Sequence, residues 1–66
     1  MSFVKFIMID SNGHHSDWWI NPSQVVSVRP RAKDNAMILT AAGVEFRVAH
    51  YADRVVSCLE MGKSEV

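Results

Sequence analysis

Hydrophobic residues alternate with polar ones along much of this chain, at the period of two that is typical of β-strands. The first such stretch, residues 3–9, is apolar except for Lys5, so a strand here would have two largely apolar faces. That pattern is typical of a strand buried on both sides, with either a core or a second copy of the chain covering each face. Residues 10–13 then contain Asn-Gly, a strong hairpin signal, and residues 14–17 extend the predicted loop.

A short returning strand and a tight turn are predicted next. Residues 18–20 carry both tryptophans and an isoleucine, and they are expected to form the returning strand. Asn21 and Pro22 then stop it, because proline has no N–H to donate to a sheet but suits the first position of a helical turn. We therefore expect one tight turn here, with Asn21 as its cap.

Residues 25–29 form the third predicted strand. Simple alternation places Val26 and Val28 on one face and the remaining side chains on the other. Pro30 is expected to end this strand because it cannot continue the hydrogen-bonded ladder. Residues 31–35 are then expected to form a polar connection.

The clearest hairpin joins residues 37–40 to residues 44–48 through a turn that contains Gly43. In the second strand, three apolar residues alternate with two charged ones, which is the pattern of a half-buried strand. Phe46 lies in the middle of the apolar set, and we expect it to face the core.

The period changes after residue 50 and indicates a helix. Its apolar residues fall on one helical stripe: Tyr51, Val55, Val56 and Leu59. Gly62 is a plausible C-cap, and residues 63–66 are expected to fray. The predicted fold is mostly β with one C-terminal α-helix, either as a small antiparallel sheet or as a partly open barrel of about five strands.

Length and composition limit the possibilities further. A chain of 66 residues provides one domain, residues 1–66, and such a domain buries only about 60% of the surface that its unfolded chain exposes. Hydrophobic residues make up 48% of the chain, so we expect a homo-oligomer that covers the excess. Cys58 is the only cysteine, so an internal disulfide is excluded, and we interpret it as a small buried hydrophobe. No signal-peptide or membrane-span pattern is present, so we expect a cytoplasmic protein without a membrane partner.

The charges balance, with seven basic and seven acidic side chains. A general polyanion binder needs a dominant basic surface, so this balance argues against nucleic acid as the main partner. A local basic patch remains compatible with it.

Several positions between residues 19 and 60 follow one known order of motifs. These are Asn21-Pro22, Val25, Val28, the strand 37–40, Gly43, Phe46, Val48 and the helical residues 55–59. This order resembles a group of small bacterial proteins typified by the flagellar and swarming protein FlbD. The same layout is similar to the core of LytTR-type DNA-binding domains. The resemblance implies the strand-rich fold and supplies no catalytic residue.

Trp18 and Trp19 are adjacent, so on a strand they point to opposite faces. One can fill the core, and the other must be exposed or covered by a partner. We expect the second indole to close a sheet edge or a subunit interface, since tryptophan is a favoured interface anchor. The alternative is a stacking platform for a base or another flat ligand.

His14 and His15 are predicted to share a loop with Asp10 and Asp17. Imidazole and carboxylate groups together can ligate zinc, but adjacent histidines rarely point at one metal ion. We expect a solvated polar loop and no metal site, and we keep the two histidines as candidate partner-binding positions.

Arg29, Arg31 and Lys33 alternate, so an extended backbone would point all three the same way and make a basic ridge. Such a ridge discourages aggregation through a sheet edge. Alternatively, it contacts phosphate on a nucleotide or a nucleic acid.

The functional hypotheses follow from these candidates. No nucleophile, metal or cofactor motif is present, so the chain is predicted not to be an enzyme and to use no cofactor. We expect a binding or adaptor protein that acts as a homo-oligomer on a protein partner, such as a phage or bacterial accessory factor. One alternative is a small-molecule binder that sequesters a nucleotide-like signal through tryptophan and arginine at a subunit interface. The other is a DNA- or RNA-binding module of LytTR-like type.

Overall fold

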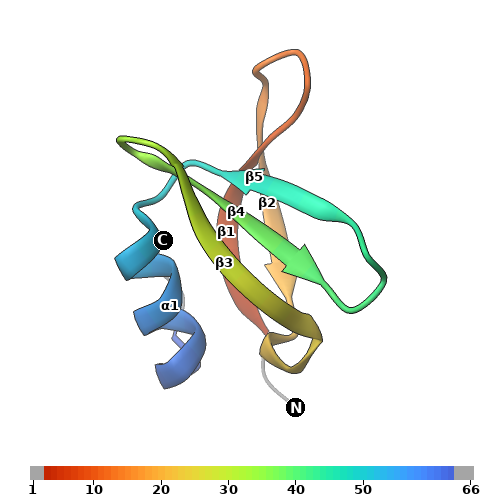
Figure 1. The fold of residues 1–66 in the computed structure, drawn as a ribbon, viewed down its shortest axis with the longest axis vertical. Helices are drawn as coiled ribbons and strands as arrows, with labels where there is room; N and C mark the ends of the chain where they lie inside the picture. The colour runs from red at the N-terminus through yellow and green to blue at the C-terminus, as the bar shows by residue number, and fades with distance from the viewer. Residues whose placement is uncertain (1–2, 64–66) are drawn as a thin grey trace.

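The computed structural model describes residues 3–63 and shows one antiparallel sheet with a helix beside it (Figure 1). Its elements are β1 (Val4–Ile9), β2 (His15–Ile20), the 3-10 turn η1 (Pro22–Gln24), β3 (Val25–Ala32), β4 (Asn35–Thr40), β5 (Glu45–Val48) and α1 (Ala52–Met61). This confirms the prediction of a mostly β fold with five antiparallel strands and a single C-terminal helix. Of the tail that was expected to fray, residues 64–66 lie outside the described part.

The strands lie in the order β2-β1-β5-β4-β3, so the two edge strands follow each other directly in the sequence. Only the turn η1 joins the end of β2 to the start of β3, and its cap is the predicted Asn21, whose side chain accepts the N–H of Ser23. The Gln24 carbonyl also accepts the N–H of Ala41, at the end of β4. So short a link holds the two edges close together at this end, and the sheet is curled (Figure 1).

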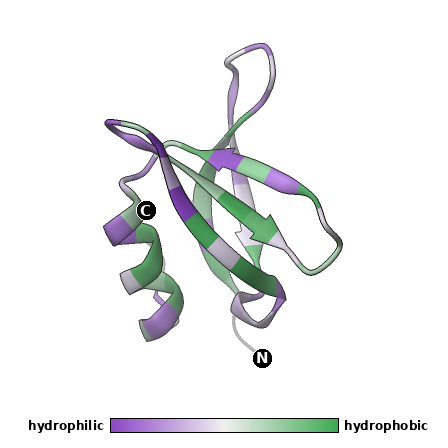
Figure 2. Cartoon of the chain, in the orientation of Figure 1, coloured by the Kyte–Doolittle hydropathy of each residue, from purple (hydrophilic) through white to green (hydrophobic). Residues whose placement is uncertain are grey.

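The core lies inside the curl. Its buried members are the apolar residues Val4, Phe6, Ile20, Ala36, Ile38, Val48, Val55 and Cys58. They come from four of the strands and from α1, and the curl brings them together. As expected, Cys58 is buried among them. Figure 2 shows hydrophobic residues along β4 and on α1, whereas hydrophilic bands mark β3 and β5.

The helix α1 covers one side of the sheet and packs against β3 and β4. Val55 and Cys58, three residues apart on one helical face, are its buried residues, and Leu59 packs beside them. The helix ends at Gly62, which has a φ of 67° and donates its N–H to the Cys58 carbonyl. A left-handed residue at this position favours glycine, and the predicted C-cap is confirmed.

His50 closes the ladder where β5 leaves β1. The Ala49 N–H donates to the Ile7 carbonyl, while the Ile7 N–H donates to Nε2 of His50 at 3.0 Å. The imidazole therefore takes the place that a strand carbonyl would have, and it also stacks edge-on against Phe6 with ring centroids 5.5 Å apart. Because Nε2 accepts, the proton of the neutral ring lies on Nδ1.

The strand β2 is longer than predicted. It begins at His15 and pairs with β1 over all six of its residues, so residues 15–17 belong to the strand instead of the loop. The loop is short because Gly13, with a φ of 81°, allows the chain to turn back after Asp10. The Asp10 carboxylate accepts the N–H groups of Asn12 and His14, which stabilises the turn locally.

The prediction that Pro30 ends the third strand is wrong. β3 continues to Ala32, and Pro30 lies opposite Ala36 in the ladder with β4. Successive residues of β4 direct their backbone hydrogen bonds alternately to β3 and to β5. The N–H of Thr40 donates to the Val44 carbonyl, on the β5 side, and every second residue of β4 shares this direction. Ala36 therefore also points to β5, so the N–H that Pro30 lacks would face solvent at the sheet edge.

The facing predicted for Val26 is also wrong. The ladder between β3 and β4 shifts register between Val25 and Ser27, and this bulge takes Val26 out of the alternation. Val26 is 63% exposed, whereas Val25 and Val28 pack against the core.

Two identical substitutions test this register. Val48→Ala, at a fully buried position, is expected to lower the free energy of unfolding by about 2–3 kcal/mol through lost burial and a cavity. Val26→Ala on the exposed bulge is expected to change it by less than about 0.5 kcal/mol. Urea unfolding of both variants is the measurement, and equal losses at the two sites would contradict the bulge.

Candidate functional site

The two tryptophans separate as their adjacency predicted. Trp18 faces inward and is half-buried, and its ring lies 4.8 Å from that of Phe46 between centroids. Phe46 is therefore core-facing, although it is only half-buried. Trp19 faces outward and remains 57% exposed. Only one indole is thus available to a partner or ligand.

Trp19 belongs to a small outward-facing cluster with Lys5 and Asp17. The Lys5 ammonium lies 5.6 Å from the centre of the Trp19 ring and 3.5 Å from Oδ2 of Asp17. The cation over the indole face and the ion pair hold the ring against the sheet. Phe3, which is 54% exposed, precedes Lys5 by two residues and extends this apolar corner.

The outer side of β2 is an open sheet edge. Asp10 donates its N–H to the His14 carbonyl, so this pair is hydrogen-bonded and the alternation continues along the hairpin. The even-numbered residues of β2 therefore bond to β1, and the N–H and C=O groups of His15, Asp17 and Trp19 point away from the sheet. No bulge or proline interrupts this strand.

The opposite edge, β3, is protected against pairing. It carries Pro30 and two register shifts, one at each end of the strand. Proline, bulges and charged side chains are the features by which natural edge strands avoid pairing with other chains. The two edges therefore differ, and of the two only β2 is a regular ladder without a proline or a bulge.

Arg29 is committed to an ion pair on the outer face. Its Nε and Nη2 donate to the two carboxylate oxygens of Glu45 at 3.0 and 3.2 Å, across β4. Hydrogen bonds from the guanidinium, and then its charge, hold the pKa of Glu45 below its ordinary value. The same partnership raises the pKa of Arg29. Arg29 is therefore a component of the surface and less available to a ligand than the ridge hypothesis assumed.

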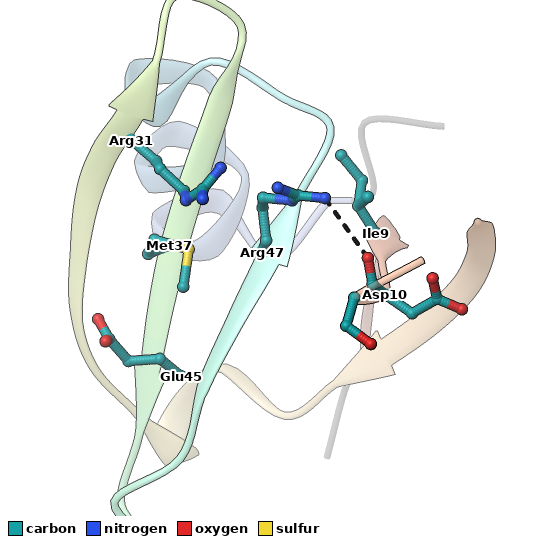
Figure 3. Close-up of a pocket in the computed structure, with 7 residues that line it drawn as sticks. Ile9, Asp10, Arg31, Met37, Glu45 and Arg47 are labelled. Atoms are coloured by element: carbon teal, nitrogen blue, oxygen red, sulfur yellow. Dashed lines mark hydrogen bonds between the residues drawn. The ribbon is translucent and has the colours of Figure 1, made fainter. Parts of the chain in front are cut away.

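Arg31 instead borders a shallow hollow on the outer face, together with Arg47 (Figure 3). The hollow has a volume of about 390 Å³, with Ile9 and Met37 as its apolar lining and Asp10 and Glu45 as its acidic one. Figure 3 shows the Arg31 side chain extending across β4 toward Arg47. We refer to this place as the arginine hollow.

The remaining candidates lie elsewhere. His14 is in the loop after β1, with Nδ1 3.8 Å from Oδ2 of Asp10, and His15 is the first residue of β2. Lys33 lies in the turn after β3, beside a different hollow that Tyr51 and Asp53 border. Within residues 3–63, no three His, Cys, Asp or Glu side chains are placed to hold one metal ion.

The combined tryptophan and arginine site is therefore not assembled within one chain. Trp19 lies on the edge strand β2 opposite Lys5, whereas Arg31 lies on the other edge strand. The bulge between Pro30 and Ala32 also breaks the alternation that would have aligned Lys33 with the arginines.

Sequence reasoning missed two residues that the structure brings into focus. Arg47 was taken only as an outward-facing charge, yet it forms half of the arginine hollow. His50 carried no predicted role, yet it accepts a backbone hydrogen bond from Ile7, 43 residues away. The alternation of β5 already placed Arg47 on the outer face, but its proximity to Arg31 depends on the strand order.

Comparisons with known proteins identify no relative: no family model, no curated protein and no solved structure matches the chain. The FlbD-like assignment therefore stays a prediction. No helix within residues 3–63 is long and apolar enough to cross a membrane.

The ion pair between Arg29 and Glu45 leads to a pH prediction. A lowered pKa in the folded state means that the pair stabilises the fold at neutral pH, and that this contribution disappears as the pH falls through the pKa of Glu45. Arg29→Ala is expected to raise the pKa of Glu45 toward its ordinary value, whereas Lys33→Ala leaves it unchanged. Carbon-detected NMR titration of the Glu45 carboxyl measures both, and an identical titration in the wild type and Arg29→Ala would contradict the pairing.

Proposed function

We propose that this chain is a non-enzymatic binding protein that forms a homo-oligomer through the edge of β2 and, in that form, binds a protein partner. The observation that carries the proposal is the contrast between the two edges. β3 is interrupted by a proline and bulges, whereas β2 keeps three outward N–H and C=O pairs in regular register. Strand addition at such an edge gains a row of backbone hydrogen bonds.

The surface beside β2 supports the same proposal. Trp19 is a rigid apolar anchor of the type that dominates interface energetics, and Lys5 and Asp17 surround it with charge. An apolar centre with a polar rim is the usual composition of a protein interface. The small core of the single chain also benefits from burial of this corner in an oligomer.

A second copy of β2 is a suitable occupant for the edge. In a two-fold antiparallel pair the residue on the axis lies opposite itself, so a register centred on Asp17 places two carboxylates together and is disfavoured. Shifting the register so that His15 lies opposite Asp17 of the other copy pairs an imidazole with a carboxylate at both positions. It also aligns residues whose backbone groups point outward.

Apolar side chains away from β2 support a further protein partner. The large hydrophobic residues exposed elsewhere are Val26, Val44, Tyr51, Val56 and Met61. Pairing through β2 would leave them uncovered, and a protein partner that seats on them is the second half of the proposal.

Asp17→Pro tests the edge selectively. The N–H of Asp17 faces the open edge, so proline here removes a donor needed for strand addition and leaves the ladder to β1 intact. Asp17→Ala is the matched control, because it loses the same ion pair to Lys5 but keeps the N–H. Sedimentation velocity across the micromolar range should give at least twice the 7.4 kDa chain mass for the wild type and Asp17→Ala.

Asp17→Pro should sediment as a monomer with an unchanged circular dichroism spectrum. A monomeric wild type, or a folded Asp17→Pro variant with an undiminished mass, would contradict association through β2.

The protein partner is tested with paired baits. Tyr51→Ala is expected to lower affinity for the partner at least tenfold, which is the effect of removing an exposed aromatic anchor worth about 1.4 kcal/mol or more. Ser27→Ala, at an exposed polar site on β3, serves as the control. Stoichiometric recovery of one protein by the wild type and Ser27→Ala, but not by Tyr51→Ala, supports the proposal. Equal recovery by all three argues against Tyr51 as the anchor.

A further inference from the structure

The arginine hollow is independent of the proposed association. It is formed by β3, β4, β5 and the end of β1, together with the start of the loop after β1, and β2 contributes no residue to it. Two guanidinium groups from different strands share this concave surface (Figure 3). The two positive charges repel each other, and an anion bound between them would offset this repulsion.

The carboxylates that border the hollow are engaged with other groups. Asp10 uses Oδ1 to accept the N–H groups of Asn12 and His14, both at 2.9 Å. Glu45 is held by both nitrogens of the Arg29 fork. Figure 3 shows the Asp10 side chain pointing away from Arg47. Neither carboxylate therefore serves as the counter-ion of the two arginines.

The arginines themselves have unused hydrogen-bonding capacity. Within residues 3–63, Arg31 makes no hydrogen bond or ion pair. Arg47 donates one long hydrogen bond, from Nη2 to the Asp10 carbonyl at 3.4 Å, and its buried Nε–H has no partner among the described residues. A buried donor without an acceptor costs free energy, and the Arg47 nitrogens that line the hollow are the ones that a ligand can reach.

We propose that the arginine hollow binds a small molecule through its phosphate group, with Arg31 and Arg47 as the ligands of the phosphate oxygens. The planar guanidinium fork matches phosphate oxygens in pairs, and two guanidinium groups line this hollow. Met37 and Ile9 supply apolar surface on which the rest of the molecule can rest. The volume of about 390 Å³ falls within the range of small-molecule sites.

Three probes separate the possible sources of the phosphate. Adenosine monophosphate, inorganic phosphate and adenosine are titrated into the full chain, with the Met37 methyl and the Arg47 Nε–H followed by NMR. Shifts with both phosphate probes support the proposal. Shifts with only one also support it and tell a phosphate ester from the free ion. Shifts with adenosine equal to those with the monophosphate, or no shift with either phosphate probe, would overturn it.

Matched variants tie the binding to the fork. Arg31→Ala is expected to weaken the phosphate probe about 10- to 100-fold, the effect of losing a charge-assisted pair, and its exposed position leaves the fold intact. Arg31→Lys keeps the charge but loses the fork, so it should bind more weakly than the wild type. Lys33→Ala removes the same charge from the neighbouring turn, outside the hollow, and should bind like the wild type.

Two further outcomes would overturn the proposal. Equal losses in Arg31→Ala and Lys33→Ala would indicate only a diffuse positive field. Tighter binding of a single-stranded oligonucleotide than of the monophosphate would indicate a nucleic-acid surface instead of a small-molecule site. Asp17→Pro should keep the phosphate affinity of the wild type, so failure of the association at β2 is distinguishable from failure here.

Discussion

The short link between β2 and β3 is the constraint on which the rest of the structure depends. In a flat sheet with the order β2-β1-β5-β4-β3, the edge strands would lie about 19 Å apart, at about 4.8 Å per strand. The chain from Ile20 to Val25, even fully extended, spans only about 17 Å, and the turn η1 shortens it. The sheet must therefore curl, and the hydrogen bond from Ala41 to Gln24 holds the link in place. The curl encloses Phe6 and Ile38, and α1 covers the side that remains open.

The same constraint creates the two candidate surfaces. A curled sheet turns its apolar face inward, so the outer face carries the charged residues of β3 and β5, and these meet in the arginine hollow. The link closes only one end of the sheet, and β2 and β3 are not paired with each other. Both strands therefore remain edges, and the sequence protects only one of them, through Pro30 and the bulges. Trp19 lies on the strand that is not protected, which makes β2 the better candidate for an interface.

Local sequence patterns predicted the strands and the helix well, but they predicted the register and the neighbours of the strands less well. The period of two and the change to helical spacing indicated the strands and α1, because burial on one face determines both patterns. The opposite facing of Trp18 and Trp19 followed from their adjacency, whereas the structure was needed to show that Trp18 is the one that faces the core. Simple alternation failed at Val26 and beyond Pro30, since a bulge and an edge position each depend on the neighbouring strand. For the same reason, the meeting of Arg31 with Arg47 could not be predicted: it requires the strand order, which residue types alone do not determine.

The central claim is that β2 pairs with another strand in solution, and amide hydrogen exchange followed residue by residue tests it most directly. Ser16 and Trp18 lie in the alternate positions that bond to β1, so their amides should be protected at every protein concentration. The amides of His15 and Asp17 face the open edge and lie opposite each other in the proposed register, so the account predicts that their protection rises as the concentration is raised through the micromolar range. Fast exchange of these two amides at all concentrations would contradict the claim.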